Sequence, residues 1–119
     1  MIFRDARTIE EQKKLLAEAD LLADLSLQVS PGVSIMQALA AGVPVVATRD
    51  AVPAGMDGSV RVCGPRREDV REALRDLLTM PVERRREWGL SAREKAKGLL
   101  HWPVLAPRYA EMYESCLRS

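Results

Sequence analysis

The stretch that decides the fold is SLQVSPGVSIMQALAAGVPVVAT, residues 26–48. Residues 34–41 predict a helix, Gly42 lies where a left-handed C-cap belongs, and Pro44 prevents the helix from continuing. Residues 45–48 then form a short apolar run, which is typical of a strand that is covered on both faces. The stretch therefore predicts a loop that leaves one strand, a helix, and a second strand.

Upstream of this stretch, the sequence predicts one helix and one strand. Thr8 offers an N-cap and Glu11 completes a capping-box pattern, so residues 9–19 should form a helix. Residues 21–25 predict a buried strand. Asp24 is unusual in such a strand, and we expect it near the strand end or hydrogen-bonded.

Downstream, the pattern predicts an exposed loop at residues 49–59 and a strand near a sheet edge at residues 60–63. Three helices are then expected, at residues 67–78, 82–99 and 104–117. The first of these helices, REDVREALRDLL, has apolar residues at i, i+3, i+4, i+7 and i+8. A break is expected at residues 101–103. The last helix is expected to carry four apolar side chains inward: Tyr109, Met112, Tyr113 and Leu117.

The alternation of strands and helices predicts one α/β domain over residues 1–119. We expect a Rossmann-like parallel sheet of about four strands flanked by helices on both faces, with a helical carboxy-terminal third. The short apolar start at residues 2–3 could close one of these strands. Ligands bind such sheets beyond the carboxyl ends of the strands, so residues 26–33 form the candidate site.

Composition excludes several classes of function. The chain has 119 residues, and its net charge of +1 argues against nucleic-acid binding driven by bulk electrostatics. Cys63 and Cys116 suggest two reduced thiols rather than a disulfide framework or a metal site, and Cys63 is expected to be a buried small hydrophobe. The sequence shows no signal peptide and no apolar run of about 18 residues. We therefore expect a soluble, cytoplasmic protein.

The loop itself offers limited chemistry. Residues 30–33 lie at a strand-to-helix turn, where backbone N–H groups can hold a phosphate, but neither a GxGxxG nor a GxxxxGK[ST] pattern is present. Gly32 suits either a simple turn or close approach to a phosphate. Ser34 and Gln37 suit either a capping box or contact with a nucleotide.

A family resemblance adds to these patterns. The segments EADLLADLS and GVSIMQALAAGVPVVAT resemble the carboxy-terminal, nucleotide-sugar donor domain of GT-B glycosyltransferases of the family 4 (group 1) type. The block at residues 37–48 is the most specific part, and Gly32 matches the second glycine of the family's GFG. The later VRVCGP, EDVREALRDLL, PVERRREWGLSAR and YAEMY segments are similar in order and spacing.

The resemblance implies a donor site for a UDP- or GDP-type sugar, with Val29, Gly32, Val33, Ser34 and Gln37 as the donor-binding positions. Such enzymes carry two glutamates with seven residues between them, and these positions fall on Val29 and Gln37. Valine offers no polar group, whereas glutamine can reach a ribose hydroxyl. The resemblance assigns no catalytic residue, metal or cofactor. It implies a domain truncated at its amino-terminal side, which we expect to be inactive alone.

Two alternatives remain open. The chain could be a catalytically silent module that docks on a partner chain or on itself through surface that missing strands leave bare. It could also be a flavodoxin-like regulatory domain, although no acidic cluster is patterned for phosphoacceptance. His101 has no patterned catalytic partner. Residues 84–86, three consecutive arginines, suit a solvated helix face or a patch for an anionic partner.

Overall fold

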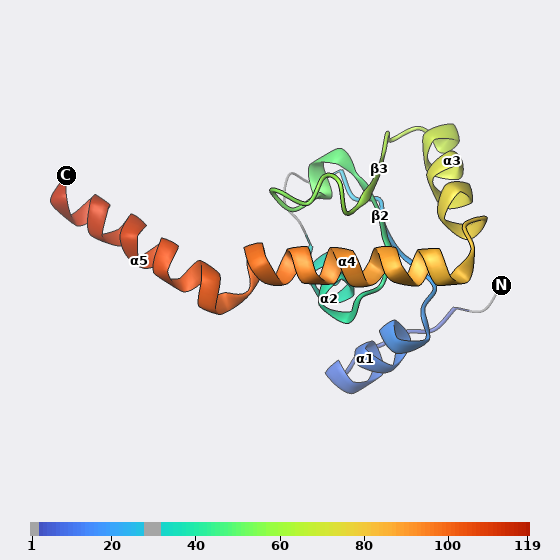
Figure 1. Cartoon of the computed structure of the whole chain (residues 1–119), viewed down its shortest axis with the longest axis horizontal. Helices are drawn as coiled ribbons and strands as arrows, with labels where there is room; N and C mark the ends of the chain where they lie inside the picture. Colours follow the sequence, from blue (N-terminus) through green and yellow to red (C-terminus); the bar gives the residue numbers. More distant parts are fainter. Residues whose placement is uncertain (1–2, 28–31) are drawn as a thin grey trace.

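The computed structural model describes residues 3–27 and 32–119 (Figure 1). Within these residues, three strands form a parallel sheet in the order β1-β2-β3: β1 (Leu22–Asp24), β2 (Val45–Thr48) and β3 (Arg61–Cys63). The helices are α1 (Ile9–Glu18), α2 (Val33–Ala41), α3 (Arg67–Leu78), α4 (Val82–Leu100) and α5 (Trp102–Arg118), with a short 3-10 helix, η1 (Arg49–Ala51). The predicted α/β class, the parallel sheet and the helical carboxy-terminal part are confirmed.

The predicted sheet of about four strands is not found. Three strands are present in the described ranges, and residues 1–2 lie outside them. Phe3, the described half of the apolar start, lies outside any strand and has 87% of its surface exposed. An apolar run of two residues is shorter than a typical strand and does not define one by itself.

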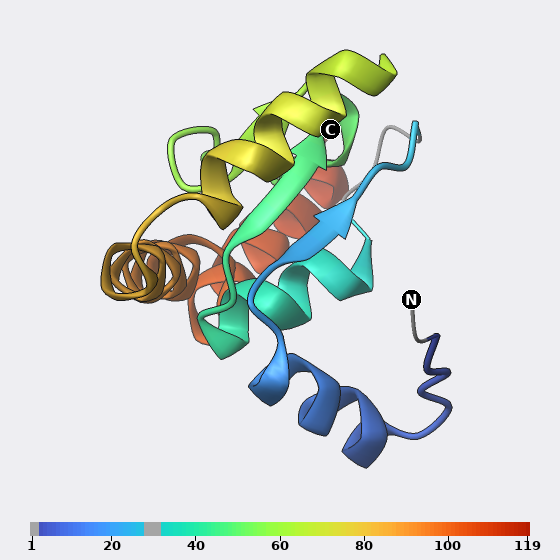
Figure 2. The same ribbon diagram turned by 90° about the vertical axis from the view of Figure 1, so that its right-hand side faces the viewer.

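Helices cover both faces of the sheet. Figure 2 shows α3 on one face and α2 on the other, with β2 between them. Because successive strand residues point to opposite faces, Val45 and Ala47 pack with Leu39 of α2, whereas Val46 packs with Leu77 of α3. All four residues of β2 are buried. This confirms the prediction of a strand that is covered on both sides.

Two predicted helix ends are also confirmed. The Thr8 hydroxyl accepts a hydrogen bond from the Glu11 N–H at 3.2 Å, and the Glu11 carboxylate accepts one from the Thr8 N–H at 3.0 Å. That backbone donation is the main cause of the lowered pKa of Glu11. Gly42 ends α2 in the left-handed conformation, with φ of 75°. This conformation turns the chain sharply from α2 toward β2.

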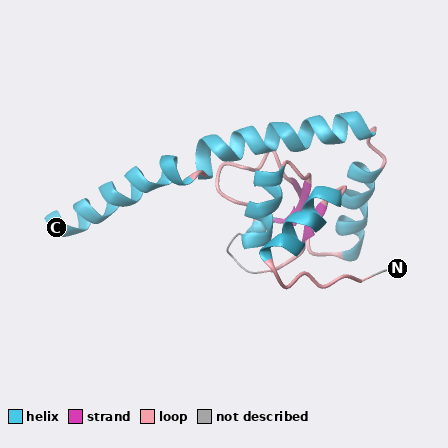
Figure 3. Cartoon of the chain, turned by 90° about the horizontal axis from the view of Figure 1, so that it is seen from below, coloured by secondary structure: helices cyan, strands magenta, loops and turns pink. Residues whose placement is uncertain are grey.

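The prediction that the last helix buries its apolar side chains is wrong. Figures 1 and 3 show α5 running away from the sheet and its covering helices. Its apolar face is consequently uncovered: Tyr109 and Met112 are 47% exposed, Tyr113 63% and Leu117 87%. Helical periodicity shows that a helix has an apolar face, but it does not show what covers that face. No described helix is both long and apolar enough to cross a bilayer.

The arginine run at residues 84–86 does not form a uniformly solvated face. Arg85 is buried, with 8% of its surface exposed, whereas Arg84 and Arg86 are exposed. The Arg85 guanidinium donates to the Asp20 carboxylate at 2.8 Å and to the Leu77 carbonyl at 3.3 Å. The middle arginine therefore joins α4 to α3 and to the segment before β1.

The two cysteines should differ in reactivity. Cys63 is buried at the end of β3, and burial raises the pKa of its thiol, whereas Cys116 is exposed on α5. Because the thiolate is the reactive form, a thiol reagent at neutral pH is expected to label Cys116 rapidly and Cys63 only on unfolding. Mass spectrometry of the labelled peptides identifies the cysteine that has reacted. Equal labelling rates in the folded protein would contradict this assignment.

Candidate functional site

The candidate site lies where β1 and β2 end. Asp24 is the last residue of β1 and Thr48 the last of β2, so their side chains lie at the same edge of the parallel sheet. The Asp24 carboxylate accepts a hydrogen bond from the Ser26 N–H at 3.1 Å. The buried Thr48 hydroxyl donates to the Ser26 carbonyl. The start of the loop is thereby tied to both strands, and Asp24 lies at a strand end and is hydrogen-bonded, as predicted.

Asp24 also reaches the start of α2. Gly32 is the N-cap of α2 and provides no side-chain hydrogen bond, while the Ser34 hydroxyl donates to the Asp24 carboxylate at 3.4 Å. A Cβ atom on Gly32 would lie 3.1 Å from the same carboxylate oxygen. The Asp24 carboxylate therefore lies at the positive, amino-terminal end of α2. There it interacts favourably with the helix dipole and disfavours the binding of a second anion.

The predicted capping box of Ser34 and Gln37 is not formed. Gly32 takes the N-cap position, Ser34 bonds to Asp24, and the Gln37 amide donates to the Gln12 side chain of α1 at 3.2 Å. Both residues thus have tertiary partners in elements that come before the loop. The local spacing was right for a cap, but more distant partners prevailed.

Four of the five donor-binding positions implied by the resemblance lie in the described residues, and these four are not gathered into one cluster. Gly32 and Ser34 lie beside Asp24, Val33 is 73% exposed, and Gln37 contacts α1. Val29 lies outside the described residues, as do its neighbours over residues 28–31. Sequence reasoning missed Asp24 as a member of this site. The signal available was an acidic residue inside an otherwise apolar strand pattern.

The segment after β2 contributes a charged pair to the same edge of the sheet. Arg49, the first residue of η1, bonds through its guanidinium to the Asp57 carboxylate at 2.6 Å, and both side chains are exposed. An exposed pair of this kind exchanges with solvent at little cost in free energy. Arg49 is therefore a cation that a ligand at the strand ends can recruit from Asp57.

The described part of the chain limits the chemistry of the site. It contains no group of three or more His, Cys, Asp or Glu side chains placed to hold a metal ion, and no buried side-chain polar atom without a hydrogen-bond partner. The edge itself offers the Asp24 carboxylate, the Ser34 hydroxyl and the exposed Arg49–Asp57 pair. These groups can hydrogen-bond a hydroxylated ligand.

No protein-family model, curated protein or solved structure matches this chain. The likeness to GT-B donor domains thus rests on the sequence motifs.

Proposed function

We propose that the chain is a donor-domain piece related to enzymes that transfer sugar from a nucleotide-sugar, and that it is inactive by itself. One observation carries the proposal. The block at residues 37–48, the most specific part of the resemblance, forms the end of α2, the left-handed turn at Gly42 and the central strand β2 of a parallel sheet. The preceding loop then starts at the carboxyl end of β1, where α/β domains bind nucleotides.

The groups at this edge favour weak binding without transfer. A diphosphate at the start of α2 would face the Asp24 carboxylate, and like charges at that distance repel. Gln37, which would meet a ribose, is held by Gln12. Glycosyl transfer needs a stabilised leaving diphosphate and a positioned acceptor. Arg49 can offset part of the diphosphate charge, but it is already paired with Asp57, and the groups described at this edge do not position an acceptor.

UDP or GDP is expected to raise the melting temperature of the purified chain. A ligand at ten times its dissociation constant stabilises the native state by about 1.4 kcal/mol. For a domain of this size, that corresponds to several degrees. Differential scanning fluorimetry with nucleotide up to about ten millimolar checks it. No shift with either nucleotide would contradict the proposal.

Substitutions at the loop test the site itself. Asp24→Asn keeps an acceptor for Ser26 while removing the charge at α2, so we expect tighter nucleotide binding. Asp50→Asn is the matched control, because Asp50 is an exposed carboxylate in η1 near the same sheet edge. The double substitution Val29→Glu and Gln37→Glu restores the carboxylates that the resemblance places at the transferred sugar and the ribose, where they accept hydrogen bonds from hydroxyl groups, so it should also strengthen binding. If neither change alters affinity beyond the control, the loop is not a donor site.

A second candidate function is a silent module that docks on another chain. The observation favouring it is uncovered apolar and backbone surface: the apolar face of α5 is exposed, and among the described strands β1 pairs with β2 alone. Open strand edges and contiguous apolar patches are common sites of association. Analytical ultracentrifugation should then show self-association that increases with concentration. If the chain is a monomer at all concentrations and no partner binds it through α5, the docking function is contradicted.

A further inference from the structure

A second concave surface lies away from the strand ends. It is a pocket of about 370 Å³ between α2, α4 and the start of α5, and its volume lies in the range of small-molecule sites. The pocket contains none of the donor-binding positions at residues 32–34 or Gln37. It is therefore a separate site from the candidate described above.

The floor and one wall of this pocket are apolar. Leu39 of α2 and Ala96 of α4 are almost fully buried beneath it, and Trp102, the first residue of α5 and 66% exposed, lines its side. The remaining apolar lining comes from Met36, Ala40 and Leu100. Such a surface favours the hydrocarbon part of a ligand, because burying it removes apolar area from water.

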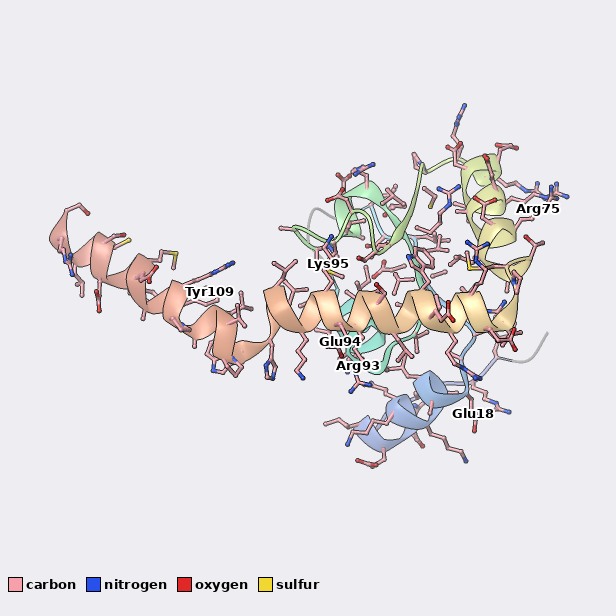
Figure 4. The ribbon with its side chains drawn as sticks, in the orientation of Figure 1. Glu18, Arg75, Arg93, Glu94, Lys95 and Tyr109 are labelled. Carbon is pink, nitrogen blue, oxygen red and sulfur yellow. The ribbon has the colours of Figure 1, made fainter. Side chains whose placement is uncertain are left out.

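The rim of the pocket is basic. Arg93 and Lys97 lie one turn apart on the same side of α4, and His101, the extended residue between α4 and α5, also lines the pocket. Figure 4 shows Arg93 on the side of α4 that faces α2, and its Cδ lies 3.8 Å from a Cβ built on Gly42. The lining contains no acidic side chain, and the three basic groups form no salt bridge within the described ranges.

An apolar floor beneath a basic rim selects for a ligand that combines both characters. We propose that this pocket binds a small amphiphilic anion, a carboxylate on an apolar chain, with the chain against Leu39 and Trp102 and the carboxylate at Arg93 and Lys97. Arginine and lysine both form charge-assisted hydrogen bonds with carboxylates. Elsewhere on α4, Arg85 is already paired with Asp20. Arg93 and Lys97 have no salt-bridge partner among the described residues, so both are available to bind a ligand's carboxylate.

Octanoate is a suitable probe, because Trp102 reports directly on the pocket. The other tryptophan, Trp88, packs against the opposite side of the sheet, so Trp88→Phe leaves Trp102 as the sole indole. Titration with octanoate is expected to change Trp102 fluorescence in a saturable manner. Decanoate should bind more tightly, by about fourfold for each additional methylene that is buried. Octanol, which lacks the charge, should bind at least tenfold more weakly than octanoate.

Charge variants separate a site from a merely basic helix face. Arg93→Gln with Lys97→Gln should weaken octanoate binding at least tenfold, while the matched pair Arg84→Gln and Arg86→Gln, exposed positions near the start of α4, should leave it unchanged. Chemical shifts of the unsubstituted chain provide a second measurement, with perturbations expected in α2 and α4. Non-saturable titration, equal binding of octanol, or equal effects of the two variant pairs would overturn the proposal.

Discussion

Replacing Gly89 by alanine is expected to destabilise the fold by about 3 kcal/mol, although alanine is ordinarily the better helix former by about 1 kcal/mol. Gly89 lies in α4 where this helix crosses the end of α2. A Cβ atom at this position would lie close to the Gly42 carbonyl group and 3.1 Å from the Pro44 ring. Glycine at position 89 is therefore what allows the two helices to approach.

The clash cannot be relieved by moving a side chain. Gly42 is fixed in the left-handed conformation that ends α2, and Pro44 leads directly into the buried strand β2. An alanine at 89 must therefore push α4 away from α2. That movement opens the contacts of Leu39 with Ala92 and Ala96, which belong to the larger apolar core.

Gly98→Ala is a matched control within the same helix. A Cβ atom on Gly98 would have no neighbour within 4 Å, so the substitution should stabilise the protein by up to about 1 kcal/mol. Urea unfolding of both variants, followed by circular dichroism, measures the contrast. Two substitutions of the same chemical type are thus expected to have opposite signs. Equal midpoints for the two variants would show that α4 does not approach α2 this closely.

The elements with strong local signals could be predicted from the sequence. The bounds of β2 and α3 agree with the prediction, because an apolar run between turn residues and a five-member helical stripe each specify one structure. Gly42 was identified as a left-handed C-cap from its position before Pro44. In each case, the residues that determine the structure are neighbours in the chain.

Features that depend on distant residues could not be predicted. Ser34 and Gln37 have capping-box spacing, yet their partners are Asp24 and Gln12, which lie 10 and 25 residues away. The apolar residues of α5 have helical spacing, yet they remain exposed because this helix leaves the sheet. A pattern indicates which face of an element is apolar or polar, and tertiary structure determines what meets that face.

Arg85→Ala is expected to destabilise the protein by about 2–3 kcal/mol. The guanidinium donates to the Leu77 carbonyl, which lies in the last turn of α3, where carbonyl groups have no partner within the helix. It also donates to Asp20 before β1. Truncation leaves a cavity and an unpaired buried carbonyl, two mechanisms with large effects on stability.

Single substitutions of the neighbouring arginines provide the control. Arg84 and Arg86 are exposed, so Arg84→Ala and Arg86→Ala should change the free energy of unfolding by less than about 0.5 kcal/mol. Thermal and urea unfolding measure all three variants. A loss for Arg85→Ala as small as for its neighbours would show that Arg85 is solvated in solution.

A double-mutant cycle with Asp20→Asn shows which contact of Arg85 matters. The Asp20 side chain is 71% exposed, so water screens this ion pair and its coupling energy should stay below about 1 kcal/mol. Most of the loss on removing Arg85 should therefore persist when Asp20 is already neutral. That result would assign the stabilisation to the contact with the α3 carbonyl and to packing. A coupling energy close to the whole effect would assign it to the ion pair instead.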